Sequence, residues 1–137
     1  MTTDRLLYLS RADVAALEIA PAQARAAVEQ AFRDHAAGRN LSLPKSALTL
    51  GPGHGFQTMT AASQAQGLAT LKWVAIAPAP TDSPTPGINA LMVVNDYASG
   101  APLAVFDGDE ITLIRTAALS AFAATRLAPQ APRPIAF

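Results

Sequence analysis

Residues 78–87 constrain the fold more than any other stretch of the chain. They hold four prolines and stand between two apolar runs, Leu68–Ala77 and Ile88–Tyr97. Proline has no N–H donor and a fixed φ, so this stretch cannot continue a helix or a central strand. The flanking runs have the length and composition of buried strands. The sequence therefore predicts two strands joined by a surface loop that borders a site or an interface.

Other short apolar runs indicate a larger sheet, mostly after Asn40, where helical spacing gives way to a strand pattern. Turn-forming stretches at residues 51–53 and 64–67 separate these runs. The further predicted strands are Leu6–Leu9, Leu48–Leu50, Phe56–Ala62 and Leu103–Phe106.

Two helices are predicted near the N-terminus. Ser10 precedes Asp13 as in a capping box, which favours a short helix running to about Ile19. Pro21 suits the first turn of a second helix, for which Gly38 is a natural stop.

A third helix is predicted after Asp107–Glu110, because acidic residues are favourable at a helix N-terminus. Pro129 and Pro132 would end it. The sequence thus predicts an α+β fold, with two N-terminal helices and one C-terminal helix packed on a mixed or antiparallel sheet.

Composition narrows the range of partners. Ten acidic and ten basic residues give zero net charge, and there is no basic run, which argues against nucleic acid. The apolar runs are too short for a membrane span, and Met1–Ser10 lacks the core of a signal peptide. We therefore expect a cytoplasmic protein. Only 15% of residues are charged, which fits either a surface covered by another domain or subunit or a small Ala-rich soluble protein.

No metal site is predicted. The chain has no cysteine, and its two histidines, His35 and His54, stand far apart without clustered carboxylates.

Three basic residues are the candidates for chemistry: Lys45, Lys72 and Arg115. Lys72 lies within a strongly apolar strand, where a buried ammonium is costly without a partner. It either points to the solvent face of a half-buried strand or belongs to a site. Arg115 lies beside Thr116 near a helix N-terminus, which suits an anion. The alternative is an arginine that extends to solvent from an amphipathic helix, with Asp109 and Glu110 as candidate ion-pair partners.

Three motifs together resemble the ornithine cyclodeaminase/mu-crystallin family. They are the glycine-then-lysine strand Gly67–Val74, the hairpin Asn95–Ala104 and the helix segment Ile111–Ala121, which contains Arg115-Thr116-Ala117-Ala118. Their order and spacing also agree with the family, and the similarity covers nearly the whole chain.

The resemblance implies a site for a small amino or imino acid. Lys45, Lys72 and Arg115 would surround the substrate, with Arg115 binding its carboxylate and Lys72 as the catalytic candidate. The cofactor, NAD or NADP, would have its nicotinamide end near Arg115, Thr116 and the segment Gly87–Asn89. The position of Lys45 is often arginine in the family, so the resemblance leaves open which substrate fits. Ornithine cyclodeaminase, ketimine or pyrroline-carboxylate reductase and alanine dehydrogenase types all remain open.

The resemblance also implies a division of the chain. Residues 1–132 would form a substrate-binding and dimerisation domain, and residues 133–137 would begin a Rossmann domain whose glycine-rich turn and catalytic aspartate the chain lacks. We therefore expect no tight cofactor binding and no activity from this chain alone. A homodimer through the sheet and a separate Rossmann-bearing polypeptide are the expected partners. The alternatives are a non-catalytic dimeric ligand-binding module, one subunit of a split enzyme, and a remnant without function.

Overall fold

The computed structural model describes residues 5–83 and 85–128, which form seven strands and three helices. The strands are β1 (Leu7–Leu9), β2 (Asn40–Ser42), β3 (Ser46–Thr49), β4 (Gly55–Ser63), β5 (Leu68–Ile76), β6 (Ile88–Asp96) and β7 (Pro102–Asp107). The helices are α1 (Arg11–Ala15), α2 (Pro21–Ala36) and α3 (Asp109–Leu127). The predicted α+β fold is confirmed.

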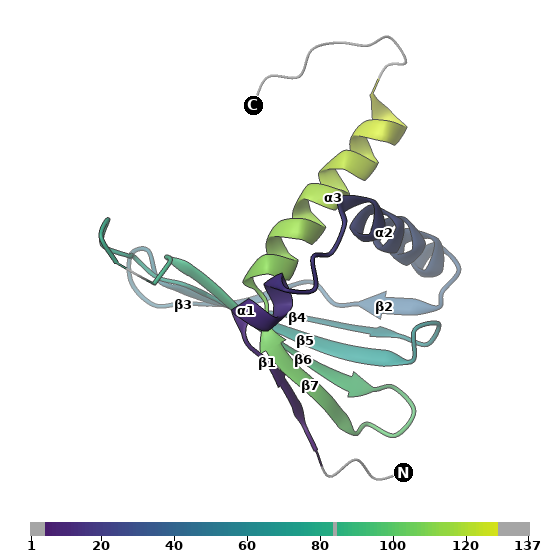
Figure 1. The fold of residues 1–137 in the computed structure, drawn as a ribbon, viewed down its shortest axis with the longest axis horizontal. Helices are drawn as coiled ribbons and strands as arrows, with labels where there is room; N and C mark the ends of the chain where they lie inside the picture. The colour runs from purple at the N-terminus through teal and green to yellow at the C-terminus, as the bar shows by residue number, and fades with distance from the viewer. Residues whose placement is uncertain (1–4, 84, 129–137) are drawn as a thin grey trace.

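One mixed sheet forms the base of the domain (Figure 1). Its strand order is β1-β7-β6-β5-β4-β2. Strands β2 and β3 pair with the same edge of β4: β2 with residues 61–63 and β3 with residues 55–58. Among the described strands, β1 and β7 pair in parallel and all other neighbours are antiparallel. The predicted strands that flank residues 78–87 are β5 and β6, which pair with each other along their whole length.

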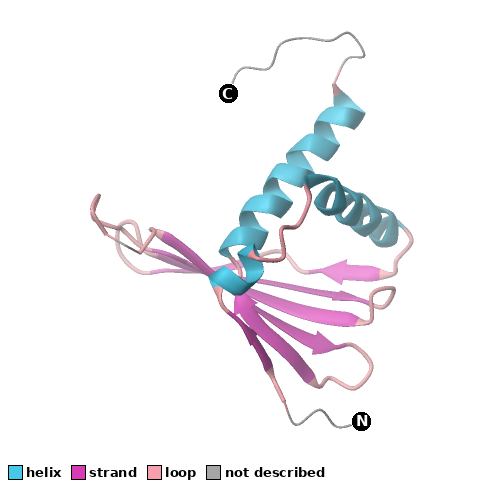
Figure 2. Cartoon of the chain, viewed as in Figure 1, coloured by secondary structure: helices cyan, strands magenta, loops and turns pink. Residues whose placement is uncertain are grey.

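The three described helices lie on one side of this sheet (Figure 2). The Ser10–Asp13 capping box is present, and Pro21 is the first residue of α2, as predicted. The prediction that the first helix reaches Ile19 was wrong, because α1 ends at Ala15. Glu18 takes a left-handed φ of 46°, which a continuing helix does not allow.

Helices α2 and α3 are joined by aromatic and charged side chains. The rings of Phe32 and Phe122 stack with centroids 5.5 Å apart. Glu29 accepts hydrogen bonds from Arg33 at 2.7 Å and from Arg126 at 2.6 Å. These contacts hold α3 beside α2 while its first turn stays close to the sheet.

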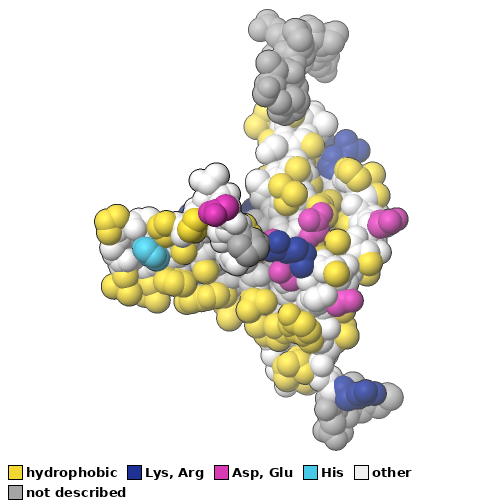
Figure 3. Space-filling view, turned by 60° about the vertical axis from the view of Figure 1, so that its left-hand side comes forward, with side chains coloured by type: hydrophobic (Ala, Val, Ile, Leu, Met, Phe, Trp, Pro, Cys, Tyr) yellow, Lys and Arg dark blue, Asp and Glu magenta, His cyan; other side chains and the backbone are white. Residues whose placement is uncertain are grey.

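The opposite side of the sheet has no helix among the described residues to cover it. Successive side chains on a strand point to opposite faces, so the contact between Lys72 and α3 places Trp73 on the far face. Trp73 stacks there on Phe56, and Leu91 lies opposite Trp73 on β6. Figure 3 shows hydrophobic side chains gathered along this side of the sheet. We call this surface the open sheet face; its apolar residues are Tyr8, Leu41, Leu48, Phe56, Leu71, Trp73, Leu91, Val93 and Val105.

Candidate functional site

The central lysine of β5 points toward the helices and is buried. Lys72 is 8% exposed, and its Nζ donates a hydrogen bond of 3.4 Å to Oγ1 of Thr112 on α3. Strand pairing places Met59 of β4 and Met92 of β6 directly opposite Lys72 on its two sides. Of the two interpretations left open by the sequence, the solvent-facing lysine is therefore the wrong one.

The surroundings of Lys72 disfavour its charge. Burial is the larger cause that lowers the pKa of Lys72 below 10.5, and the nearby positive charge of Arg115 lowers it further. Neither cause involves a carboxylate. Lys72 can therefore lose its proton more readily than an ordinary lysine, which suits a group that exchanges a proton with a bound ligand.

A cavity of about 420 Å³ brings Lys72 together with the other two basic candidates, Lys45 and Arg115. Lys45 lies just before β3, and Arg115 lies in the second turn of α3. Unlike Lys72, both are exposed. The lining residues are Ser42, Leu43, Lys45, Met59, Thr60, Ala61, Thr70, Lys72, Met92, Ile111, Thr112 and Arg115. The described lining thus carries three basic side chains and no carboxylate, a composition that favours a negatively charged group.

Arg115 does not form the alternative ion pair with the start of its own helix. In the described part of the chain, Asp109 pairs with Arg11 of α1 instead, and no ion pair joins Arg115 to Glu110. Arg115 is nevertheless exposed, so its side chain lines the cavity and also reaches solvent, and no ion pair with another described residue engages its guanidinium.

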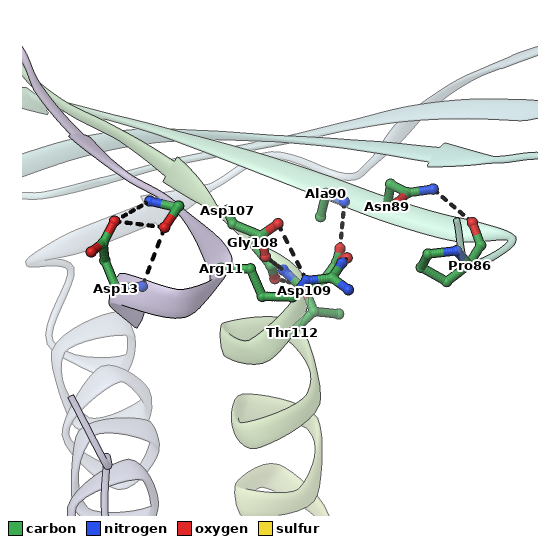
Figure 4. Close-up of polar contacts among 10 residues, drawn as sticks. Arg11, Asp13, Pro86, Asn89, Ala90, Asp107, Gly108, Asp109 and Thr112 are labelled. Carbon is green, nitrogen blue, oxygen red and sulfur yellow. Dashed lines mark hydrogen bonds and ion pairs between the residues drawn. The ribbon is translucent and has the colours of Figure 1, made fainter. Parts of the chain in front are cut away.

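The first turn of α3 is anchored to β6 (Figure 4). The backbone N–H of Gly108 donates to Ala90 O at 2.8 Å, and the backbone N–H of Ala90 donates to Oδ1 of Asp109 at 2.6 Å. Arg11 pairs with the second carboxylate oxygen of Asp109. Ala90 and Met92 lie on the same face of β6, and Met92 is paired with Lys72 on β5. An α3 anchored at Ala90 therefore has Thr112, three residues after Asp109, within hydrogen-bond distance of Lys72. The sequence suggested a helix start and a possible pairing with Arg115 for Asp109, but not its contact with β6, which is distant along the chain.

The remaining predicted site residues lie outside this cavity. Thr116 is exposed on α3, and its hydroxyl donates to Thr112 O at 2.6 Å. Asn89 donates through Nδ2 to Pro86 O at 2.8 Å (Figure 4), and its position on β6 places it on the open sheet face. Gly87 is packed so closely that an added Cβ would lie 2.9 Å from Ala77 O.

These positions test whether the described residues fit a dinucleotide. Asn89 lies on the open sheet face, whereas Thr116 lies on α3, on the other side of the sheet, and Gly87 is confined by its close packing against Ala77 O. They form no cradle for a dinucleotide by themselves. For the residues that the structure covers, no group of three or more His, Cys, Asp or Glu side chains is arranged to hold a metal ion. None of the described helices is long and apolar enough to cross a membrane.

Comparison with known proteins identifies the family. Residues 6–137 match the profile of the ornithine cyclodeaminase/mu-crystallin family, so the chain belongs to that family. The resemblance found in the three sequence motifs is confirmed.

Three relatives show how much of a family member this chain represents. The nodulation efficiency protein NfeD of Rhizobium meliloti is 35% identical over 131 residues, which cover 94% of this chain and 40% of that protein. An archaeal alanine dehydrogenase dimer with bound NAD superposes with a TM-score of 0.82 at 37% identity, covering 90% of this chain and 38% of that one. The Δ1-pyrroline-2-carboxylate reductase of Thermococcus litoralis, in complex with NADH and L-proline, gives a TM-score of 0.84 at 28% identity, covering 91% and 39%. The chain therefore spans about 40% of the length of these relatives.

Proposed function

We propose that this chain is the substrate-binding part of an NAD(P)-dependent enzyme that acts on a small amino or imino acid. The observation that carries the proposal is the convergence of Lys45, Lys72 and Arg115 on one cavity whose described lining has no carboxylate. Two relatives support it, since one is an alanine dehydrogenase with bound NAD and the other a pyrroline-carboxylate reductase in complex with NADH and L-proline.

The three basic residues have different roles in this proposal. Arg115 presents a planar guanidinium that can bind a carboxylate through two parallel hydrogen bonds, which fixes the orientation of the ligand. Lys45 adds charge at the exposed rim without that geometry. Lys72, buried and with a lowered pKa, is placed to give or take a proton beside the bound carboxylate.

The rest of the active site is proposed to come from outside the described residues. NAD or NADP supplies hydride transfer when bound, and the present residues bind and orient the substrate for it. We propose that residues 1–132 form the substrate-binding domain; the suggested start of a Rossmann domain at residues 133–137 lies outside the described residues. Because Gly87, Asn89 and Thr116 form no dinucleotide cradle by themselves, we expect neither tight cofactor binding nor turnover by this chain alone.

Calorimetry with L-proline and L-alanine tests the carboxylate site. Arg115→Ala is expected to weaken binding more than Lys45→Ala does, because Arg115 sits on an anchored helix and Lys45 in an exposed connection. Arg126→Ala, on the same helix but outside the cavity, is the matched control. An equal loss of affinity in Arg115→Ala and Lys45→Ala would contradict the role of Arg115 as the main carboxylate ligand. Unchanged affinity in both variants would show that the ligand does not bind at the proposed site.

A second proposal concerns assembly: the open sheet face joins two copies of this chain. Leu91 and Trp73 lie on this face with 46% and 38% of their surface exposed. Large contiguous apolar patches are rare on monomers and mark association sites. A dimer formed through this face is also compatible with the alternative function, a non-catalytic dimeric ligand-binding module.

Sedimentation over a range of concentrations tests the dimer. Leu91→Glu should give a monomer, because it places a charge in the centre of the face. Leu113→Glu should remain dimeric, since Leu113 is also exposed, at 67%, but lies on α3. A wild-type chain that stays monomeric at high concentration, or a Leu91→Glu variant that still dimerises, would refute the arrangement.

A further inference from the structure

The cavity around Lys72 has a chemistry beyond carboxylate binding. Its cations come from three separate segments: the connection before β3, the middle of β5 and the second turn of α3. The two nearby acids at the start of α3 do not balance them. Asp109 is engaged by Ala90 N–H and Arg11, and both Asp109 and Glu110 line a neighbouring cavity instead. A ligand in the Lys72 cavity therefore meets a net positive field from the described residues.

The side chains of the cavity lining that stand next to Lys72 are apolar. Met59 and Met92 stand on the two strands beside it, and Ile111 lies above on α3. Methionine side chains are flexible and polarisable, and they accommodate small apolar groups of various shapes. Neither strand offers an acidic side chain at the position next to Lys72.

We propose that Met59 and Met92 determine specificity, and that the cavity selects amino or imino acids with a short uncharged side chain and rejects diamino acids. The inference rests on the proposed carboxylate site. A mono-amino acid is a zwitterion of zero net charge, whereas a diamino acid carries a further ammonium. That ammonium would lose its water beside methionines and face Lys72, Lys45 and Arg115 without a carboxylate partner.

The test compares two ligands that differ mainly in one ammonium group. L-norvaline and L-ornithine have the same carbon chain, but ornithine carries a second amine at its end. By calorimetry on the whole chain, norvaline should bind at least about tenfold more tightly than ornithine, a factor that corresponds to a difference of roughly 1.4 kcal/mol. Arg115→Ala should weaken the binding of norvaline.

Variants at the two methionines complete the test. Met59→Glu should narrow or reverse the preference, since it adds a carboxylate beside Lys72, and Met59→Leu should leave it unchanged. Met92→Glu repeats the test from the other strand if Met59→Glu does not fold. Equal binding of both ligands, lost together in Arg115→Ala, would overturn the selectivity and leave the carboxylate site standing. No binding of either ligand, or binding indifferent to Arg115→Ala, would overturn the proposed function and the selectivity with it.

Discussion

Replacing Asp109 by alanine tests the anchor that positions α3 over the sheet. The carboxylate accepts the Ala90 N–H at 2.6 Å, and Ala90 is only 6% exposed, so its amide would be left buried without a partner. Losing a hydrogen bond to a charged group costs about 1.5–3 kcal/mol. The acidic residue at the helix N-terminus contributes about 0.3–1 kcal/mol more. The ion pair with Arg11, whose side chain is 53% exposed, adds at most about 1 kcal/mol.

The expected loss is therefore about 2–5 kcal/mol out of a typical domain stability of about 5–15 kcal/mol. Urea denaturation measures it as a lower midpoint with an unchanged slope. Asp109→Asn keeps an acceptor for the Ala90 N–H and should lose about half as much. Arg11→Met removes the ion pairs of Arg11 with Asp109 and Asp107 but keeps the Ala90 hydrogen bond, and should lose about 1 kcal/mol. An Asp109→Ala variant as stable as the wild type, or an Arg11→Met variant just as damaged, would refute the anchor as described.

Two further predictions concern the same region. Gly108→Ala should cost about 1–3 kcal/mol, because its Cβ would lie 3.1 Å from both Ala90 Cβ and Met92 Cγ. Gly55→Ala, where an added Cβ meets nothing within 4 Å, is the control in the same denaturation assay; equal effects would count against close packing at Gly108. Lys72→Met should raise the free energy of unfolding at neutral pH, because the unfolded chain holds the Lys72 proton up to a pKa near 10.5 and the folded chain releases it earlier. The wild type regains stability as pH rises from the lowered pKa of Lys72 to 10.5. The difference in free energy of unfolding between Lys72→Met and the wild type should therefore shrink over this pH range. A difference that does not change with pH would show that the charge of Lys72 is not its cause.

The elements marked by local signals were predictable from the sequence. The Ser10–Asp13 capping box, Pro21 in the first turn of α2 and the acidic start of α3 all depend on contacts within a few residues. The paired strands β5 and β6 were predictable because both are long apolar runs bounded by turns. The three family motifs also lie in these strongly patterned segments.

Features that depend on distant partners were not predictable. Strand β2 was missed because Asn40–Ser42 is short and its pairing with β4 creates it. Asp34 is 2% exposed and pairs with Arg39 at 2.6 Å, although its place on α2 resembles that of any surface acid. Side chains of β5 alternate between the two faces of the sheet, and the sequence did not show on which face Lys72 lies. The position of α3, whose Thr112 contacts Lys72, decides it.

Methionine-methyl NMR tests the central claim, that a small carboxylate binds beside Lys72, most directly. Two of the three methionines, Met59 and Met92, line the cavity, so their methyl signals should shift saturably with L-proline or L-alanine. Met59→Leu and Met92→Leu assign the signals. We predict that Arg115→Ala weakens these shifts and that Arg126→Ala leaves them as in the wild type. Methyl signals that do not respond to the carboxylates, or that respond equally in Arg115→Ala, would contradict the account.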